Sequence, residues 1–509
     1  MRTKALSLGV LLGFAVIGFT VPSRAQSTKV TAPSGWVPKS VAYVKASNTA
    51  ASAQFGEWVA LSGDGNTMAV GAVNESGGAK GINGNQAAKP QIKDSGAIYV
   101  YVKRNGAWAQ QAYIKASNPR EETLFGNAVA LSDDGNTMIV GEYLENSGAK
   151  GVNGNQSDTS LDSSGAAYIF TRTGTTWSQQ AYLKASNPGE GDQFGFAVAV
   201  SGDGNTVAVG AIEEASKAGG VDGDQSDRSA EGDGAVYIFG RSGTTWSQQA
   251  YTKPDDQKDE RKGEFGYAVA LSNDGSTMAA GDQDAGPGYV LVFVRSGSKW
   301  SKQAVIKASN AENGDNLGWC LAISGDGNTI VAGSNDEDSV LFGVQTDPNL
   351  GAHDANRDTS TGAAYVFVRD ASGKWSQQVW LKAINTRKND QFGESITISG
   401  DGNTIAVGSI FGAGAGGSKG VNADPNDDSL PGTGSVYIYT RSGNIWTPGA
   451  YVKAPNARTS AEFGKSVALS ADGKTMAAGS FYETSAAKGI NGNQADTSAP
   501  EAGAAYIYY

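Results

Sequence analysis

Residues 55–72 read Phe-Gly-Glu-Trp-Val-Ala-Leu-Ser-Gly-Asp-Gly-Asn-Thr-Met-Ala-Val-Gly-Ala, and this stretch returns with small changes along the whole chain. The seven copies begin at Phe55, Phe125, Phe194, Phe265, Leu317, Phe392 and Phe463. Within a copy, side chains alternate at the period of a β-strand, Asp64-Gly65-Asn66 has the composition of a tight turn, and Thr67 begins a return strand. The pattern predicts seven β-hairpins.

Two further strand-like segments follow each hairpin. In the first copy they are residues 97–102 and 108–117, joined by a turn that contains Gly106. Both are rich in β-branched and aromatic residues at alternate positions. Seven four-stranded antiparallel sheets predict an all-β protein with the architecture of a seven-bladed β-propeller, since each sheet can bury its faces only against its neighbours.

The two ends of the chain each supply part of the seventh sheet. Residues 503–509 match a third strand and the chain then stops, whereas residues 36–47 match the fourth strand of the first copy. We expect the N-terminal strand to complete the last blade, which removes the exposed edges that an open stack would carry. The propeller should occupy residues 34–509 as a single domain, after a short linker at 26–33.

Residues 1–25 have the three parts of a secretory signal: Arg2 and Lys4, an apolar run over 5–20, and Ser-Arg-Ala before Gln26. The alternative, a membrane anchor, needs about 20 uninterrupted apolar residues. We expect cleavage near Ala25, no membrane insertion of the mature chain, and a secreted or extracytoplasmic location in the periplasm, the envelope or outside the cell.

Charge and cysteine content narrow the class of partner. Cleavage would change the net charge from −11 to −14, which disfavours nucleic acid and favours cations or basic partners. The one cysteine, Cys320, cannot form an internal disulfide, and the other copies have mostly small residues at its position, so a packing role is favoured over a reactive thiol. We expect a monomer.

The long segments after the second strands are the most elaborate part of each copy. They should share one face of the ring with the connections between blades, while the tight turns share the other face. Loops of about 20 to 30 residues exceed ordinary connections, and function concentrates on such loops. We therefore expect recognition on the long-loop face.

The phrase Phe-Gly-x-x-Val-Ala-Leu-Ser, followed by Val-Gly-Ala, resembles the FG-GAP repeat of integrin α-subunit heads and their bacterial relatives. The resemblance implies a propeller of the integrin α type, extracellular recognition and often calcium binding. Calcium-binding members carry Asp-x-Asp-x-Asp-Gly-x-x-Asp between the first two strands, but here that turn is only residues 62–67. That calcium site does not carry over.

A second calcium hypothesis concerns the long loops. The sequence Gly-Val-Asn-Gly-Asn-Gln-Ser-Asp at 151–158 recurs at 81–88, 220–227, 420–427 and 489–496, with a degenerate copy at 351–358. Closely spaced oxygens can supply the six to eight ligands that Ca²⁺ takes at roughly 2.3–2.6 Å. The candidate metal ligands are Asp222, Asp224, Asp227, Asp424, Asp427 and Asp428. Self-contained turn formation by Asn, Gly and Asp is the alternative, and it is favoured.

Catalysis has little support in the sequence. His353 is the only histidine, so a Ser-His-Asp triad or a His-ligated zinc would depend on it alone. Departures from the repeat at 255–262, after Asp282 and at 335–357 could shape an asymmetric recognition site. The leading hypothesis is a non-enzymatic binding or adhesion protein for an extracellular protein or glycan, with no certain cofactor and with Ca²⁺ as a candidate. Two alternatives stay open: a polysaccharide-active hydrolase or lyase with carboxylates near the central channel, and a structural envelope protein.

Overall fold

The computed structural model describes residues 36–230, 232–255, 263–347, 359–412 and 419–509. All regular elements in these ranges are β-strands. Residues 32–509 form one compact unit. In the described ranges, no helix is long and apolar enough to cross a membrane.

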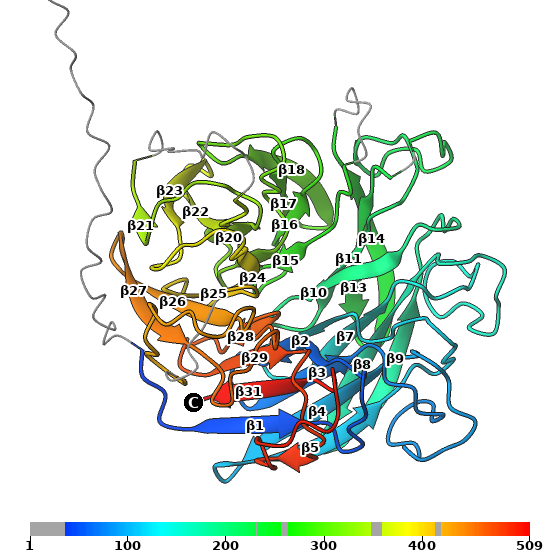
Figure 1. The fold of residues 1–509 in the computed structure, drawn as a ribbon. Helices are drawn as coiled ribbons and strands as arrows, with labels where there is room; N and C mark the ends of the chain where they lie inside the picture. The colour runs from blue at the N-terminus through cyan, green and yellow to red at the C-terminus, as the bar shows by residue number, and fades with distance from the viewer. Residues whose placement is uncertain (1–35, 231, 256–262, 348–358, 413–418) are drawn as a thin grey trace, which may run out of the picture. The chain divides into compact units, whose positions relative to one another are not determined.

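Seven antiparallel sheets follow one another along the chain, and each is called a blade here (Figure 1). Blade 1 contains β2 (Phe55–Leu61), β3 (Thr67–Ala72), β4 (Ala97–Arg104) and β5 (Ala107–Ile114). Blade 2 contains β6 (Ala128–Leu131), β7 (Thr137–Glu142), β8 (Ala166–Thr173) and β9 (Thr176–Leu183). Blade 3 contains β10 (Phe194–Val200), β11 (Thr206–Ala211), β13 (Ala235–Ser242), β14 (Thr245–Lys253) and the short β12 (Gly220–Val221).

The remaining blades repeat this order. Blade 4 contains β15 (Val269–Leu271), β16 (Thr277–Asp282), β17 (Tyr289–Ser296) and β18 (Lys299–Ile306). Blade 5 contains β19 (Leu321–Ile323), β20 (Thr329–Ser334), β22 (Ala363–Arg369), β23 (Trp375–Leu381) and the short β21 (Val344–Gln345). Blade 6 contains β24 (Phe392–Ile398), β25 (Thr404–Ser409), β26 (Ser435–Ser442) and β27 (Ile445–Val452). Blade 7 contains β28 (Val467–Leu469), β29 (Met476–Ser480), β31 (Ala504–Tyr508), β1 (Val41–Lys45) and the short β30 (Gly489–Ile490).

The blades close into a ring, as the sequence predicts. The first strand of each blade contacts that of the next, from β2 through β6, β10, β15, β19, β24 and β28 back to β2. In blade 7 the N-terminal β1 pairs antiparallel with the C-terminal β31, Val41 opposite Tyr508, and Figure 1 shows the two side by side in blue and red. The N-terminal strand therefore closes the seven-bladed β-propeller.

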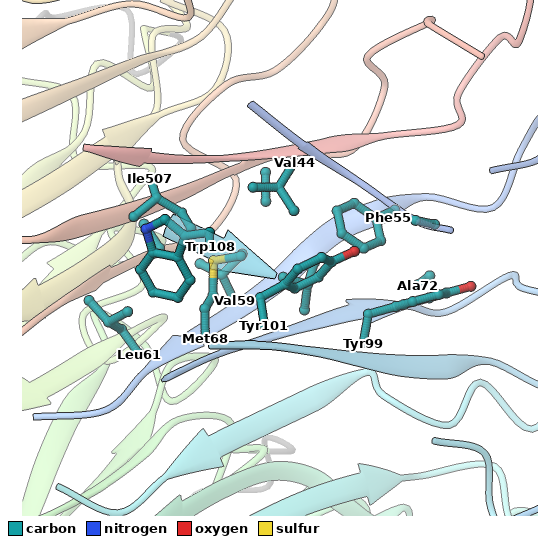
Figure 2. Close-up of a cluster of buried hydrophobic side chains, with 14 of the residues drawn as sticks. Val44, Phe55, Val59, Leu61, Met68, Ala72, Tyr99, Tyr101, Trp108 and Ile507 are labelled. Carbon is teal, nitrogen blue, oxygen red and sulfur yellow. The ribbon is translucent and has the colours of Figure 1, made fainter. Parts of the chain in front are cut away.

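Seven buried clusters hold the ring together, one between each pair of neighbouring blades. The cluster between blades 7 and 1 joins Val44 and Ile507 to Phe55, Tyr101 and Trp108 (Figure 2). Its tryptophan lies at the position that recurs once in every blade. Burial of aliphatic and aromatic side chains between sheets stabilises such a ring.

Close backbone contact explains why glycines recur at two positions of the repeat. Gly71 lies in the second strand of blade 1, and a Cβ there would come 2.4 Å from the carbonyl oxygen of Gly126 in blade 2. Gly126 itself has a φ of 96°, which other residues rarely adopt. The two glycines recur together in every copy because they let adjacent blades touch.

The loops divide between two faces. Arg172 at the end of β8 donates to Asn136 in the tight turn before β7 at 2.9 Å, so both turns lie on one face, called the turn face. Asn118 in the connection from blade 1 to blade 2 donates to Glu145 in the long loop of blade 2 at 3.1 Å, which places both on the loop face. The predicted separation of short turns from long loops is confirmed.

The long loops also pair with the outermost strands, which the sequence did not predict. β12, β21 and β30 add a two-residue strand to β14, β23 and β1. Single bridges do the same at Ile82, Val152 and Val421. In blade 5 the corresponding contacts are made by Gly343-Val344-Gln345. The degenerate copy that the sequence places at 351–358 lies outside the described residues.

Candidate functional site

A cavity of about 220 Å³ lies at the centre of the ring. All seven blades contribute a first-strand residue to its wall: Val59, Val129, Val198, Val269, Leu321, Ile396 and Val467. These side chains belong to the repeated pattern, so the wall is apolar and nearly symmetric.

A ring of backbone hydrogen bonds surrounds the turn-face end of this cavity. One amide in each blade donates to a carbonyl of the next, at 2.8–3.2 Å. The carbonyls belong to Asp133, Gly202, Asn273, Gly325, Gly400, Ala471 and Gly63.

Two side chains fill the space inside this ring. Asn273 Nδ2 donates to Asp133 Oδ2 at 2.6 Å, although the residues belong to blades 4 and 2. A Cβ on Gly63, Gly202 or Gly325 would lie within 2.5–2.8 Å of one of these two side chains. Burial, followed by the neighbouring carboxylates Asp134, Asp203 and Asp64, raises the pKa of Asp133. The turn face is thus plugged, and a ligand would have to enter from the loop face.

One position of the repeat differs from blade to blade at the loop-face end of the cavity. It directly follows the glycine of Phe-Gly, where the connection between blades enters the first strand. The seven residues there are Glu57, Asn127, Phe196, Tyr267, Trp319, Glu394 and Lys465. This ring of residues is called the channel mouth here. Together with Trp58 and Cys320 at the next position of the repeat, it makes the cavity asymmetric.

Blades 3 to 5 give the channel mouth an aromatic half. The ring centroids of Phe196 and Tyr267 are 5.0 Å apart, and those of Tyr267 and Trp319 are 4.8 Å apart. Tyr143 extends the row, with its centroid 5.5 Å from that of Phe196. Such a row offers stacking surface to a sugar ring, an apolar side chain or a cation.

Blades 6, 7 and 1 give the channel mouth a charged half. Lys465 Nζ lies 2.7 Å from Glu394 Oε1, and Asn335 donates to Glu394 Oε2 at 3.1 Å. Burial raises the pKa of Glu57, an effect that Lys465 partly offsets. Burial likewise raises the pKa of Glu462, the residue before Phe463, to about 7.

Three buried acceptor oxygens in this region have no hydrogen-bond partner among the described residues: Glu57 Oε2, Asn127 Oδ1 and Asn335 Oδ1. An unsatisfied buried acceptor costs about 1–3 kcal/mol. A ligand that brings hydroxyl or amino donors would recover this cost.

The candidate metal ligands of the blade-3 loop are engaged in local hydrogen bonds. Asp222 Oδ1 accepts from the amide of Tyr251 at 3.0 Å, and the amide of Asp222 donates to the Tyr251 carbonyl at 2.8 Å. Asp224 and Asp227 each accept from the amide two residues ahead, at 2.9 and 3.0 Å. Hydrogen bonds from Ser226 lower the pKa of Asp224.

The blade-6 candidates have similar surroundings. Asp424 Oδ1 accepts from the amide of Asn426 at 2.9 Å, and Asp427 Oδ1 from that of Ser429 at 3.1 Å, while Asp428 is exposed. In the ranges that the structure covers, no group of three or more His, Cys, Asp or Glu side chains could hold a metal ion. Calcium binding by these six aspartates stays a prediction.

The tight turns do not fit the calcium site of the integrin α type. Asp64 Oδ1 accepts from Ser62 Oγ at 2.5 Å and from the amide of Asn66 at 2.9 Å, so the carboxylate closes its own turn. The same bonds recur at Asp134 and Asp326.

The other residues singled out from the sequence add little to the candidate site. His353 lies outside the described residues, as do 256–262. Cys320 lines the cavity and donates its thiol to the Gly393 carbonyl at 3.0 Å. Burial raises the pKa of this thiol, which agrees with the predicted packing role. The channel mouth was not predicted from the sequence, although the seven copies differ visibly at the position after Phe-Gly.

Comparison with known protein families agrees with the repeated pattern of the chain. The family model for the FG-GAP repeat matches residues 108–170, 177–239, 300–347 and 375–439. No curated protein sequence matches the chain. The β-propeller domain of Cps50 (Swd1) from Myceliophteria thermophila is 8% identical, with a TM-score of 0.49 over 92% of this chain and 100% of that one. Hydrazine synthase from Kuenenia stuttgartiensis is 12% identical, with a TM-score of 0.45 over 83% of this chain and 92% of that one. At these values, neither structure indicates an activity.

Proposed function

Because this chain is a seven-bladed β-propeller with FG-GAP repeats, we propose that it is an exported, non-enzymatic binding protein that recognises an extracellular protein or glycan through its loop face. The channel mouth is the observation that supports this proposal. Its aromatic half offers a stacking surface, and its charged half offers buried acceptors to donor groups. A plugged turn face suits the insertion of one sugar unit or one side chain rather than passage through the ring.

A binding screen with substitutions at the channel mouth tests this proposal. Residues 26–509 are screened against immobilised glycans and extracellular proteins, and each hit is titrated against Trp319→Ala and Glu57→Gln. Both variants should weaken binding at least about tenfold, equivalent to about 1.4 kcal/mol. Ile445→Ala, which removes an exposed apolar side chain from the turn face, serves as the control and should bind normally. Ligands that bind both channel-mouth variants as tightly as the parent protein would refute recognition at this site.

Calcium ordering of the loops is part of the same proposal. Thermal unfolding with added Ca²⁺ and with chelator tests it, because an ion at 100 times its dissociation constant stabilises the fold by about 2.7 kcal/mol. The shift should disappear when Asp222 and Asp224 are both changed to Asn. Superimposable melting curves in the parent protein would remove calcium from the proposal.

A second candidate is a polysaccharide-active hydrolase or lyase. The observation that favours it is the group of Glu57, Glu394 and Glu462 around Lys465, all of which influence its pKa. A carboxyl group with a pKa near 7, such as that of Glu462, suits a general acid. Product release from a panel of polysaccharides, lost in Glu462→Gln with binding retained, would favour the enzyme over the binding protein.

A further inference from the structure

Six blades cover the free edge of their outermost strand with their own long loop. In blade 1 the amide of Lys115 donates to Gly81 at 2.9 Å, and the amide and carbonyl of Tyr113 bond to Asn83 at 3.0 and 2.7 Å. The Lys amide makes the same bond at Lys184, Lys382 and Lys453, at 2.8–2.9 Å. These contacts satisfy backbone groups that an open sheet edge would expose to other chains.

Blade 4 has no such cover among the residues that the structure describes. Only residues 283–288 connect β16 to β17, too few to reach the outer edge. Among the described residues, β18 pairs with β17 alone. Val305 and Lys307 correspond to Tyr113 and Lys115 of blade 1. Within the described ranges, no backbone group pairs with the amide and carbonyl of Val305 or with the amide of Lys307. Val305 is 50% exposed, whereas Tyr113, the corresponding residue of blade 1, is only 2% exposed.

The surroundings of this edge are polar and basic, with a few apolar side chains. A groove of about 370 Å³ runs between β18 and blade 5, lined by Val305 and Lys307 on one side and by Lys374 and Trp375 on the other. Lys307 and Lys374 are exposed, as is Lys299 at the start of β18. This local excess of lysines stands on a chain whose net charge is −11.

We propose that the outer edge of β18 binds an extended, acidic segment of a partner protein, which adds an antiparallel strand to blade 4. The six covered blades supply the geometry, because their loops show which backbone groups the added strand would meet. The lysines supply the charge preference. A second copy of the chain is the less suitable partner, since pairing two β18 edges would bring like charges together.

Hydrogen exchange of the intact mature protein tests whether the edge is open. The amide of Lys307 should exchange at least about fivefold faster than those of Lys115 and Lys184, because each of those two amides makes a hydrogen bond worth about 1 kcal/mol. Equal protection in dilute protein would mean that another part of the chain covers the edge, and would overturn the proposal. Protection of the Lys307 amide that rises with protein concentration and disappears in Val305→Pro would identify a second copy of the chain as the partner. That result would also overturn the proposal.

Peptide binding tests the chemistry of the partner. The probe is a fluorescent peptide with the sequence of residues 220–227, which contains three aspartates, and its neutral counterpart has the sequence of residues 81–88. The acidic peptide should bind at least about tenfold more tightly, as expected for recognition that gains about 1.4 kcal/mol from charge. Equal binding of the two peptides, or of neither at millimolar concentration, would overturn the proposal.

Two variants locate the binding on β18. Val305→Pro removes an outward amide that β17 does not use, and Lys307→Glu reverses a charge without touching the backbone. Each should abolish binding of the acidic peptide with the melting temperature unchanged. Lys80→Glu makes the same charge reversal at an exposed lysine of blade 1 and should leave binding intact. Binding that survives Lys307→Glu would place the peptide elsewhere.

Discussion

Glu142 ends the second strand of blade 2, where the other copies have Ala, Ser or Asp. It is fully buried, and Tyr168 donates its hydroxyl to Oε2 at 2.5 Å. Its Oε1 has no hydrogen-bond partner in the described ranges. Burial raises the pKa of Glu142 from its ordinary value of 4.5 to about 8, so the folded protein holds this carboxyl protonated at neutral pH.

This buried acid should make stability depend on pH. Since the folded pKa is the higher one, the stabilising contribution is complete below pH 4.5 and is lost as the pH rises through 8. The loss is at most about 1.4 kcal/mol per pH unit. Glu142→Gln stays neutral throughout, so its free energy of unfolding should fall less than that of the parent between pH 5 and pH 8. Denaturant unfolding at both values measures the difference.

Other buried acids are present in both the parent and the variant, so their contributions to the pH dependence of unfolding cancel in this comparison. Asp282, for example, has a pKa raised by burial to about 8 and is present in parent and variant alike. Parallel stability profiles for the two proteins would mean that Glu142 is ionised in the fold.

At the scale of elements, the loop motif shows how a repeated sequence can be recognised while its role is missed. Its periodic return was clear, but its partner is the outer strand of the same blade, about thirty residues away in the chain. The amide of Asn153 donates to the Tyr182 carbonyl at 2.7 Å, and its side chain accepts from the Tyr182 amide at 3.0 Å. Such pairing depends on tertiary contacts that strand periodicity does not reveal.

A matched pair of asparagines isolates the energy of this side-chain bond. Asn153 and Asn422 have φ values of 56° and 57°, and each donates its amide to the outer strand at 2.7 Å. Asn422 Oδ1, however, has no hydrogen-bond partner among the described residues. Glycine suits this φ, so Asn153→Gly should cost about 1 kcal/mol more than Asn422→Gly. Chemical denaturation of both variants measures this difference, and equal losses would contradict the role assigned to the side chain.

At the scale of the whole molecule, the repeated features of the sequence predicted the fold, but contacts between residues that are not part of the repeat could not be predicted. The two glycines of the repeat are present in all seven copies and fix the number of blades, because close packing of adjacent blades demands both of them. The contact between Asp133 and Asn273 joins blades 2 and 4 across the axis and follows from no local pattern. The channel mouth was likewise hidden, since its residues become neighbours only when the ring closes. Each lies about fifty to seventy-five residues from the next in the chain.

The pairing of the two chain ends in blade 7 gives a test of how the whole ring closes. The backbone of Tyr509 exchanges hydrogen bonds with that of Ser40, at 2.9 and 3.0 Å, so the chain ends meet within blade 7. Residues 50–52, between β1 and β2, are exposed. A circular permutant could therefore begin at Ala51, run to Tyr509, and continue through a linker with the sequence of residues 103–107 into residues 36–50. Blade 1 uses that linker sequence to join its own third and fourth strands.

The permutant should fold and melt within a few degrees of the parent, because it keeps every strand pair and moves the chain ends to an exposed site. A shortened chain of residues 51–509, without the appended strand, provides the comparison. It loses β1, leaves one edge of β31 unpaired and opens the cluster that contains Val44. We expect this chain to aggregate or to melt well below the other two. Thermal unfolding by circular dichroism and light scattering separates the outcomes, and a permutant as unstable as the shortened chain would mean that closure requires the natural order of the strands.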